Sequence, residues 1–225
     1  MFGIPVKERV RRTVETVEIL RHAWTGERFT YEGRIFSFDQ VRIMPRPAQE
    51  GGPPIWLAGS AEPAIRRAGR MGDGYIRTRG GGVQQMEVDL KIAEEAARAA
   101  GRDPGSFSFA QLQNTFAWED GDAWEVVRHG VAHQIGVYAG WAAGGDTPGQ
   151  GFVLPPQDED KLRHITPSGT PQEVVRALRP IVESFGGRKE FHLIVRLHYP
   201  GMDFGTSSRA IEVFGEKVLP ALRGA

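Results

Sequence analysis

The sequence of 225 residues contains no cysteine. This absence excludes a disulfide framework, a zinc site built on thiolates and a cysteine nucleophile. Nothing in the composition therefore requires an oxidising compartment, and we expect the protein in the cytoplasm.

A net charge and long apolar runs are also absent. Lys and Arg together number 28, as do Asp and Glu, so no net field attracts nucleic acid or an anionic membrane surface. Residues 1–6 lack the basic start and sustained apolar run of a signal peptide, and no later segment is apolar over the length that spans a bilayer. We therefore expect no nucleic-acid partner and no membrane association.

Several motifs of known chemistry are missing as well. His129 and His133 lie four residues apart on a predicted helix, but no HExxH pattern surrounds them, so we expect no metal site. The sequence has no GxSxG elbow and no Walker loop, and the glycines at 80–82 lack the lysine of a phosphate-transfer loop. The sequence therefore points to no residue as a catalytic acid or base.

What the sequence does contain is a regular alternation of predicted strands and helices. Short apolar runs bounded by Gly, Pro or Asp predict strands, and apolar residues three and four apart predict helices. The order begins with a helix at 5–24 and a short hairpin over 29–31 and 35–38 that turns at Glu32 and Gly33. Strands follow at 54–58, 73–78, 106–118 and 191–198, and helices at 61–71, 84–100, 122–138, from 171 after an N-cap threonine, and at 207–222.

Four strands that alternate with helices predict an α/β fold with a parallel sheet and right-handed crossovers. A doubly wound sheet and a barrel both satisfy this order. Residues 139–165 are rich in Gly, Pro, Gln and Asp without periodicity, so we expect an irregular excursion there. We treat residues 1–225 as a single domain.

A candidate anion site lies where the strand at 54–58 meets the next helix. Gly59 and Ser60 end the strand, and the first helical turn, from Ala61, presents unpaired N–H groups and the positive end of the helix dipole. Gly59 permits close approach of an anion, and the Ser60 hydroxyl can donate to a phosphate oxygen. The alternative is an ordinary connection in which Ser60 only caps the helix.

Glu62 in the first helical turn would repel a phosphate dianion, so a nearby cation is expected. Arg77 and Arg79, at the end of the strand at 73–78, would emerge at the same edge of a parallel sheet. A solvated surface charge is the alternative for each. His198 ends the last predicted strand and would face that edge too, either as a cofactor or substrate contact or as a packed or solvent-facing side chain.

Several short segments in this chain occur together, in the same order, in a known family. They are RxxRxxE at 9–15, ILRxxWTGE at 19–27, YEG at 31–33, PRP at 45–47, PPIWLAGS at 53–60, RAxxMGDG at 67–74, GTPQEV at 169–174 and VLPAL at 218–222. In this order and spacing they resemble the bacterial luciferase-like monooxygenase family of flavin- and deazaflavin-dependent oxidoreductases. The resemblance covers the C-terminal part of the family pattern, from its fourth helix onward.

The resemblance implies a partial (β/α)8 TIM barrel, roughly the C-terminal half, with a short hairpin insertion. It implies a flavin- or deazaflavin-dependent oxidoreductase or monooxygenase, with FMN or the deazaflavin coenzyme bound through its phosphate at Gly59, Ser60 and Ala61. Arg12 lies in the stretch where the family has a phosphate-binding arginine. The expected partners are a small-molecule substrate and either a second copy or a complementing N-terminal half. The alternative is a non-catalytic, truncated half-barrel remnant that folds or associates without a competent redox site.

Overall fold

The computed structural model describes residues 4–78, 80–142, 156–188 and 190–224. The strands are β1 (Phe29–Glu32), β2 (Ser37–Val41), β3 (Trp56–Ala58), β4 (Gly74–Arg77), β5 (Ser108–Asn114), β6 (Phe116–Ala117), β7 (Ser168–Gly169) and β8 (Phe191–Arg196). The α-helices are α1 (Arg9–Ala23), α2 (Glu62–Met71), α3 (Gly82–Ala99), α4 (Ala123–Ala142), α5 (Pro156–Ile165), α6 (Pro171–Phe185), α7 (Phe204–Val213) and α8 (Leu219–Arg223). Short 3₁₀ turns η1 (Val6–Glu8) and η2 (Pro104–Ser106) and a π-helical turn η3 (Phe214–Val218) complete the described elements.

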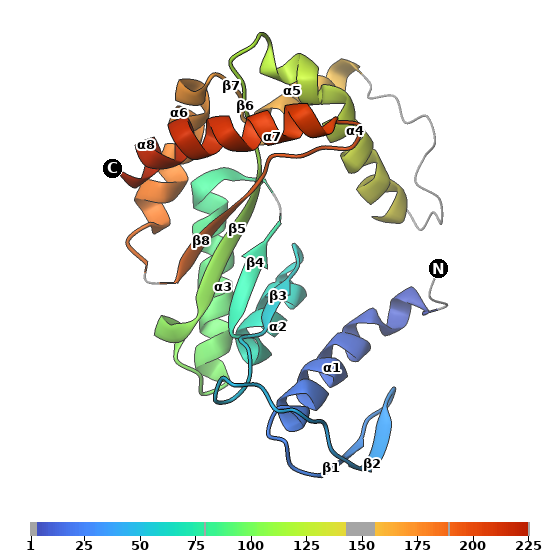
Figure 1. Ribbon diagram of the computed structural model, residues 1–225. Helices are drawn as coiled ribbons and strands as arrows, with labels where there is room; N and C mark the ends of the chain where they lie inside the picture. The colour runs from blue at the N-terminus through green and yellow to red at the C-terminus, as the bar shows by residue number, and fades with distance from the viewer. Residues whose placement is uncertain (1–3, 79, 143–155, 189, 225) are drawn as a thin grey trace.

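The central feature is a four-stranded parallel sheet in the order β3-β4-β5-β8. Each of the four strands was predicted, and the α/β fold with a parallel sheet is confirmed. Figure 1 shows the strands running together, with α4, α5 and α7 near their carboxyl ends and the β1-β2 hairpin beyond their amino ends.

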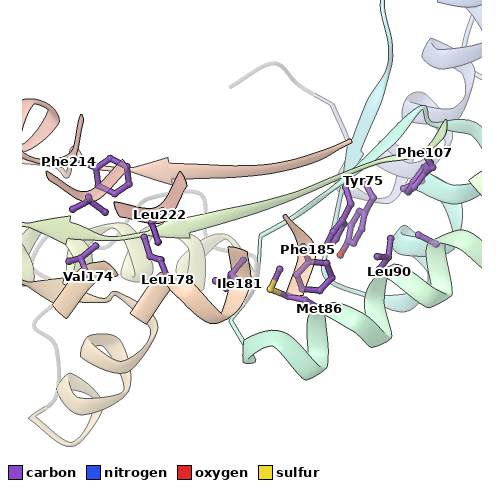
Figure 2. Packing of buried hydrophobic residues seen from close by; sticks show 14 of the residues in the cluster. Tyr75, Met86, Leu90, Phe107, Val174, Leu178, Ile181, Phe185, Phe214 and Leu222 are labelled. Carbon is purple, nitrogen blue, oxygen red and sulfur yellow. The ribbon is translucent and has the colours of Figure 1, made fainter. Parts of the chain in front are cut away.

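One face of the sheet carries the main hydrophobic core. Alternate strand residues such as Tyr75, Phe109 and Leu193 point to this face and pack against helices α2, α3, α6 and α8. Figure 2 shows Met86 of α3 and Phe185 of α6 beside Tyr75 in this core. Among the described residues, these helices cover the sheet on a single side, as in a barrel wall, whereas a doubly wound sheet has helices on both faces.

The opposite face of the sheet is lined by small or partly exposed side chains. Ala110 is fully buried there, while Ile194 on the outermost strand is 37% exposed. A second, smaller core joins α4, α5 and α7, centred on the buried residues Trp124, Val131 and Tyr199. Figure 1 shows α4, α5 and α7, which contribute to this second core, beyond the carboxyl ends of the strands.

The hairpin differs from its predicted bounds because of one buried carboxylate. Strand β2 begins at Ser37, and residues 34–36 lie in the turn. Their backbone N–H groups donate to the carboxylate of Glu15 on α1, at 2.8 to 3.3 Å. These donors are satisfied by a side chain, so they do not enter the strand ladder.

Helix α1 joins the sheet through Asp73, just before β4. The carboxylate of Asp73 accepts hydrogen bonds from Arg21 of α1 at 3.1 Å, from Arg102 after α3 at 2.8 Å and from the backbone N–H of Ile55 at 2.8 Å. This carboxylate therefore links three segments that lie far apart in the sequence.

The third predicted strand, 106–118, is interrupted at Thr115. The Thr115 N–H donates to Arg196 and its hydroxyl donates to the carbonyl of Pro167, so the chain turns out of the main sheet. Beyond it, β6 pairs with β7 in a separate two-stranded parallel sheet. Strand β5 therefore ends at Asn114, four residues earlier than predicted.

The expected irregular excursion at 139–165 is partly helical. Helix α4 continues to Ala142, and α5 occupies Pro156–Ile165, so the prediction was wrong for these two stretches. The acidic first turn and basic last turn of α5 complement its dipole, a signal that the Gly- and Pro-rich composition around it obscured. The middle of the predicted excursion, 143–155, lies outside the described residues.

Within the described residues, we find no helix with both the length and the apolar composition needed to cross a bilayer.

Candidate functional site

The carboxyl ends of β3, β4, β5 and β8 meet at one edge of the sheet because the strands are parallel. A cavity of about 410 Å³ opens at this edge, which we call the mouth cavity. Its described lining consists of Thr78, Gly80, Gln111, Leu112, Gln113, Asn114, Gln134, Ile135, Tyr138, Ile165 and Arg196. Strand ends therefore form its floor, and α4 with the end of α5 contributes a wall. In parallel α/β folds this end of the sheet is where ligands bind.

The predicted Gly59–Ser60 junction adjoins the mouth cavity. The hydroxyl oxygens of Ser60 and Thr78 are 3.4 Å apart, and Thr78 lines the cavity. The carbonyl of Gly59 accepts a 2.8 Å hydrogen bond from the hydroxyl of the buried Tyr75, which fixes the loop. A Cβ at position 59 would meet the Cβ of Ala64 at 2.5 Å, so the loop approaches α2 as closely as only glycine permits.

The first turn of α2 is free of side-chain capping. Ala61 is the N-cap residue, with extended backbone, and no side chain caps the helix. The alternative that Ser60 serves as the N-cap is therefore not what the structure shows. Glu62 pairs with Arg66 at 2.7 Å, so its carboxylate already has a cationic partner on its own helix. Pro63 has no N–H, and the N–H groups of Ala64 and Ile65 donate to the carbonyl of Ala61, at 2.8 and 3.1 Å. The backbone N–H groups of Ala61 and Glu62 are therefore the ones that can donate to an anionic ligand.

Arg77 occupies a different place from the one expected of an auxiliary cation at the junction. Its side chain is 1% exposed and lies on the helix-covered side of the sheet. The guanidinium pairs with Asp89 of α3 at 2.7 Å and donates to Gln111 at 2.8 Å and to the carbonyl of Gly80 at 2.5 Å. Arg77 therefore holds the glycine loop after β4 against the sheet, because burial leaves its charge to protein partners.

The other sequence-predicted site residues are not brought to the junction. Arg12 pairs with Glu8 at 2.9 Å, and its guanidinium lies 5.5 Å from the ring centroid of Phe36 in the hairpin. Arg79 lies outside the described residues. His198 is exposed and its Nδ1 is 2.7 Å from the hydroxyl of Ser207, and it is not part of the described lining of the mouth cavity.

Sequence reasoning did not single out the polar side chains that line the mouth cavity, among them Thr78, Asn114, Gln134 and Arg196. Asn114 and Arg196 are the last residues of β5 and β8. The predicted strands extended to 118 and 198, so these two residues were taken as strand interior. For Arg196, a charged residue directly after the apolar residues 193–195 was the available signal.

A second hollow of about 550 Å³ lies between the end of α1 and the loop after β2, lined by Arg21, Trp24, Arg46 and residues 47–51. It adjoins the amino ends of the strands, because Arg21 contacts Asp73 before β4. Residues at that end of a barrel serve stability, so the mouth cavity is the better functional candidate. Among the residues that the structure describes, no group of three or more His, Asp or Glu side chains could hold a metal ion.

The family comparison matches most of the chain. A model of the family described as luciferase-like monooxygenase matches residues 1–189. The F420-dependent glucose-6-phosphate dehydrogenase of Nakamurella multipartita is 30% identical over 223 residues, covering 96% of this chain and 61% of that protein. The enzyme of the same name from Rhodococcus hoagii is 29% identical over 231 residues, covering 96% of this chain and 62% of that protein. The chain thus spans about 61% of the length of the curated relatives it matches.

Solved structures agree with the fold. Monooxygenase RslO1 from Streptomyces bottropensis superposes with a TM-score of 0.72 at 26% identity, over 97% of this chain and 63% of that one. An F420-dependent secondary alcohol dehydrogenase superposes with a TM-score of 0.68 at 21% identity, over 98% of this chain and 64% of that one. The neighbours are TIM-barrel enzymes of this type, so the four-stranded sheet corresponds to part of such a barrel.

Proposed function

The chain belongs to the luciferase-like monooxygenase family, and from this premise we propose that it acts in a flavin- or deazaflavin-dependent oxidoreductase, with the cofactor phosphate bound at Gly59, Ser60 and Ala61. One observation carries the proposal. The first turn of α2 has no side-chain cap, and it stands beside the Ser60 and Thr78 hydroxyls at the mouth of the sheet. We take this combination, with the N–H groups of Ala61 and Glu62, as the candidate anion site.

The relatives support a cofactor of this class without choosing between its two members. The matched dehydrogenases are named for their dependence on F420, and one solved neighbour, a Baeyer–Villiger monooxygenase from Pseudomonas putida, is described in complex with FMN. In both FMN and the deazaflavin coenzyme, a phosphate is attached to the side chain of the ring system. One phosphate site could therefore bind either cofactor. When bound, such a cofactor supplies the redox chemistry, and the protein supplies binding and orientation.

The residues at the junction fit a phosphate on steric and electrostatic grounds. Gly59 lets the loop lie close against the start of α2, where a Cβ would clash with Ala64, and the Ser60 and Thr78 hydroxyls can each donate to a phosphate oxygen. The N–H groups at the start of α2 and its dipole favour negative charge. Glu62 is unfavourable to an anion, and its pairing with Arg66 reduces the repulsion.

Arg77 takes part indirectly in this proposal. By binding the Gly80 carbonyl and Asp89 together, it fixes the loop that follows Thr78. We therefore assign it a positioning role for Thr78, in place of direct contact with the phosphate.

The proposal also includes a partner. In the described part of the chain, β3 and β8 each pair on one side only, which leaves both outer edges of the parallel sheet open. A complementing N-terminal half that carries further parallel strands would pair with both edges and cover the inner face. The relative from Nakamurella multipartita is longer than this chain, which covers 61% of it, and this difference in length supports the proposal of such a unit.

A charge substitution tests the phosphate site. FMN and the deazaflavin coenzyme are titrated separately into the wild-type protein, Ser60→Asp and Ser60→Asn, with fluorescence as the readout. Asp and Asn have nearly the same size, but Asp is negatively charged and only accepts hydrogen bonds, whereas Asn is neutral and can donate to a phosphate oxygen. We expect at least about tenfold weaker binding for Ser60→Asp and near wild-type binding for Ser60→Asn, because the new carboxylate repels the phosphate. Equal binding by Ser60→Asp and wild type would remove the junction from the proposed site.

A further inference from the structure

The mouth cavity contains a second polar group, at the opposite end from Ser60. Asn114 and Arg196 are register partners on the adjacent strands β5 and β8, and each is the last residue of its strand. Paired residues in a parallel sheet point to the same face. Both residues line the cavity, so an amide and a guanidinium stand side by side on its floor.

We propose that Asn114 and Arg196 bind an anionic group, a carboxylate or a phosphate, on the small-molecule substrate. This inference rests on the proposed function, because it places the substrate in the cavity that adjoins the cofactor junction. It assigns a substrate class, an anionic small molecule, to the site.

The first support is that neither side chain is engaged elsewhere. Among the described residues, the Arg196 guanidinium makes no hydrogen bond or ion pair, and the side-chain amide of Asn114 makes none either. Arg196 is half-buried at the end of β8. A partly desolvated arginine attracts an anion more strongly than one in open solvent, since water screens the charge less.

The second support is the contrast with the neighbouring amides, which have partners. Gln111 accepts from Arg77 at 2.8 Å and donates to the carbonyl of Leu112 at 2.7 Å. Gln113 donates to the carbonyls of Asn114 and Ile165, at 2.8 and 3.1 Å. These two glutamines therefore build the cavity, and the unengaged polar groups at the strand ends remain for a ligand.

The third support is the charge of the cavity. In the described lining, Arg196 is the one charged side chain, and no carboxylate accompanies it. Guanidinium presents parallel N–H donors that match the two oxygens of a carboxylate or phosphate. Across the cavity, the buried Oε1 of Gln134 has no hydrogen-bond partner, so it can accept from a hydroxyl or N–H group on the same molecule.

The test uses three probes that share a benzene ring: benzoate, phenyl phosphate and uncharged benzyl alcohol. Binding to the 225-residue protein is measured by ligand-observed NMR for wild type, Arg196→Gln and Arg196→Lys. Arg98→Gln is the matched control, because it removes the same charge from the exposed face of α3. Circular dichroism and thermal unfolding confirm that each variant is folded.

We expect wild type to bind at least one anionic probe and to bind benzyl alcohol more weakly. Arg196→Gln should weaken that binding by about tenfold or more, since hydrogen bonds to charged groups are among the stronger ones. Arg196→Lys should weaken it less, and Arg98→Gln should leave it within about twofold. Preference for benzoate or for phenyl phosphate identifies the anionic group. Unchanged anion binding by Arg196→Gln, or equal binding of benzyl alcohol, would overturn the inference.

Repeating the titration with saturating FMN separates this inference from the proposed function. If the probe and FMN bind together, the anion site at Arg196 is distinct from the cofactor phosphate site, as proposed. If FMN displaces the probe in wild type, Arg196 holds the cofactor phosphate, and the assignment to substrate is wrong. If FMN and the deazaflavin coenzyme both fail to bind while the anionic probe still depends on Arg196, the cofactor proposal fails and the anion site stands.

Discussion

The rings of Trp56 and His192 meet at a centroid distance of 4.8 Å, in an edge-on arrangement, although they lie on the first and last strands of the sheet. Two strands separate β3 from β8, and flat strands spaced about 4.8 Å apart would put these backbones about 14 Å from each other. The residues between the two rings on this face, Gly74 and Ser108, are small, so the rings can approach each other. The sheet therefore curves toward its uncovered face. This curvature is that of a barrel wall.

The first prediction concerns Gly74 on this inner face. A Cβ at position 74 would lie 2.9 Å from both the Trp56 ring and the Cβ of Ser108. Gly74→Ala should therefore displace Trp56 and lower the free energy of unfolding by about 2 kcal/mol, as measured by urea denaturation. Gly187→Ala serves as control, because a Cβ there meets nothing within 4 Å. Equal stability of the two variants would show that the inner face is not packed as described.

The second prediction concerns the buried ion pair of Arg77 and Asp89. Both side chains are almost inaccessible to solvent, at 1% and 0%. Arg77→Met should lower the free energy of unfolding by about 4 kcal/mol, because it leaves a buried carboxylate without its cation. The double variant Arg77→Met with Asp89→Leu should recover part of that loss in the same denaturation experiment.

The control for the ion pair is Arg98→Met on the exposed side of α3. Its partner Glu94 lies 3.4 Å away and the arginine is 56% exposed, so the loss should be below about 1 kcal/mol. A comparable loss from Arg77→Met and Arg98→Met would contradict the positioning role given to Arg77.

The third prediction concerns the carboxylate of Glu15 beneath the hairpin. Burial raises its pKa, but the backbone N–H groups of residues 34–36 and the side chain of Arg11 outweigh this and lower the pKa from 4.5 to about 2. A carboxyl group whose pKa falls on folding stabilises the folded state above pH 4.5, and this contribution is lost as the pH falls toward 2.

Glu15→Gln should therefore lower the Tm by about 5 °C at neutral pH, because the amide accepts these hydrogen bonds more weakly. The difference from wild type should shrink as thermal unfolding is repeated at falling pH. Glu32→Gln, an exposed substitution in the same hairpin, should change neither the Tm nor its pH dependence. A difference between Glu15→Gln and wild type that persists at pH 2 would refute the assigned role.

The fourth prediction concerns the open edges of the sheet. Without a complementing unit, the outer edge of β8 is available for pairing with another strand, and the partly exposed side chain of Ile194 in β8 adds apolar surface to it. The 225-residue chain alone should sediment at micromolar concentration as a dimer or larger species, and Ile194→Lys should reduce this association. A wild-type monomer under these conditions would argue that the edges need no partner.

The sequence by itself determined the parallel sheet, its four strands and the position of the Gly59–Ser60 junction. These features depend on local signals: short apolar runs, helical periodicity, glycine at a tight connection, and segments in a family-specific order. The capping box at the start of α6, where Thr170 and Glu173 exchange hydrogen bonds, is another example, since both partners lie within one helical turn.

Only the tertiary structure determined which side chains line the mouth cavity. Arg77 and Arg196 both end strands of the same sheet, yet one is buried against Asp89 and the other lines the cavity. Three features determine which of the two arginines is buried: the alternation of side chains along a strand, the point at which Thr115 interrupts β5, and the packing of α3. Each depends on contacts between residues far apart in the sequence, which composition and periodicity do not encode.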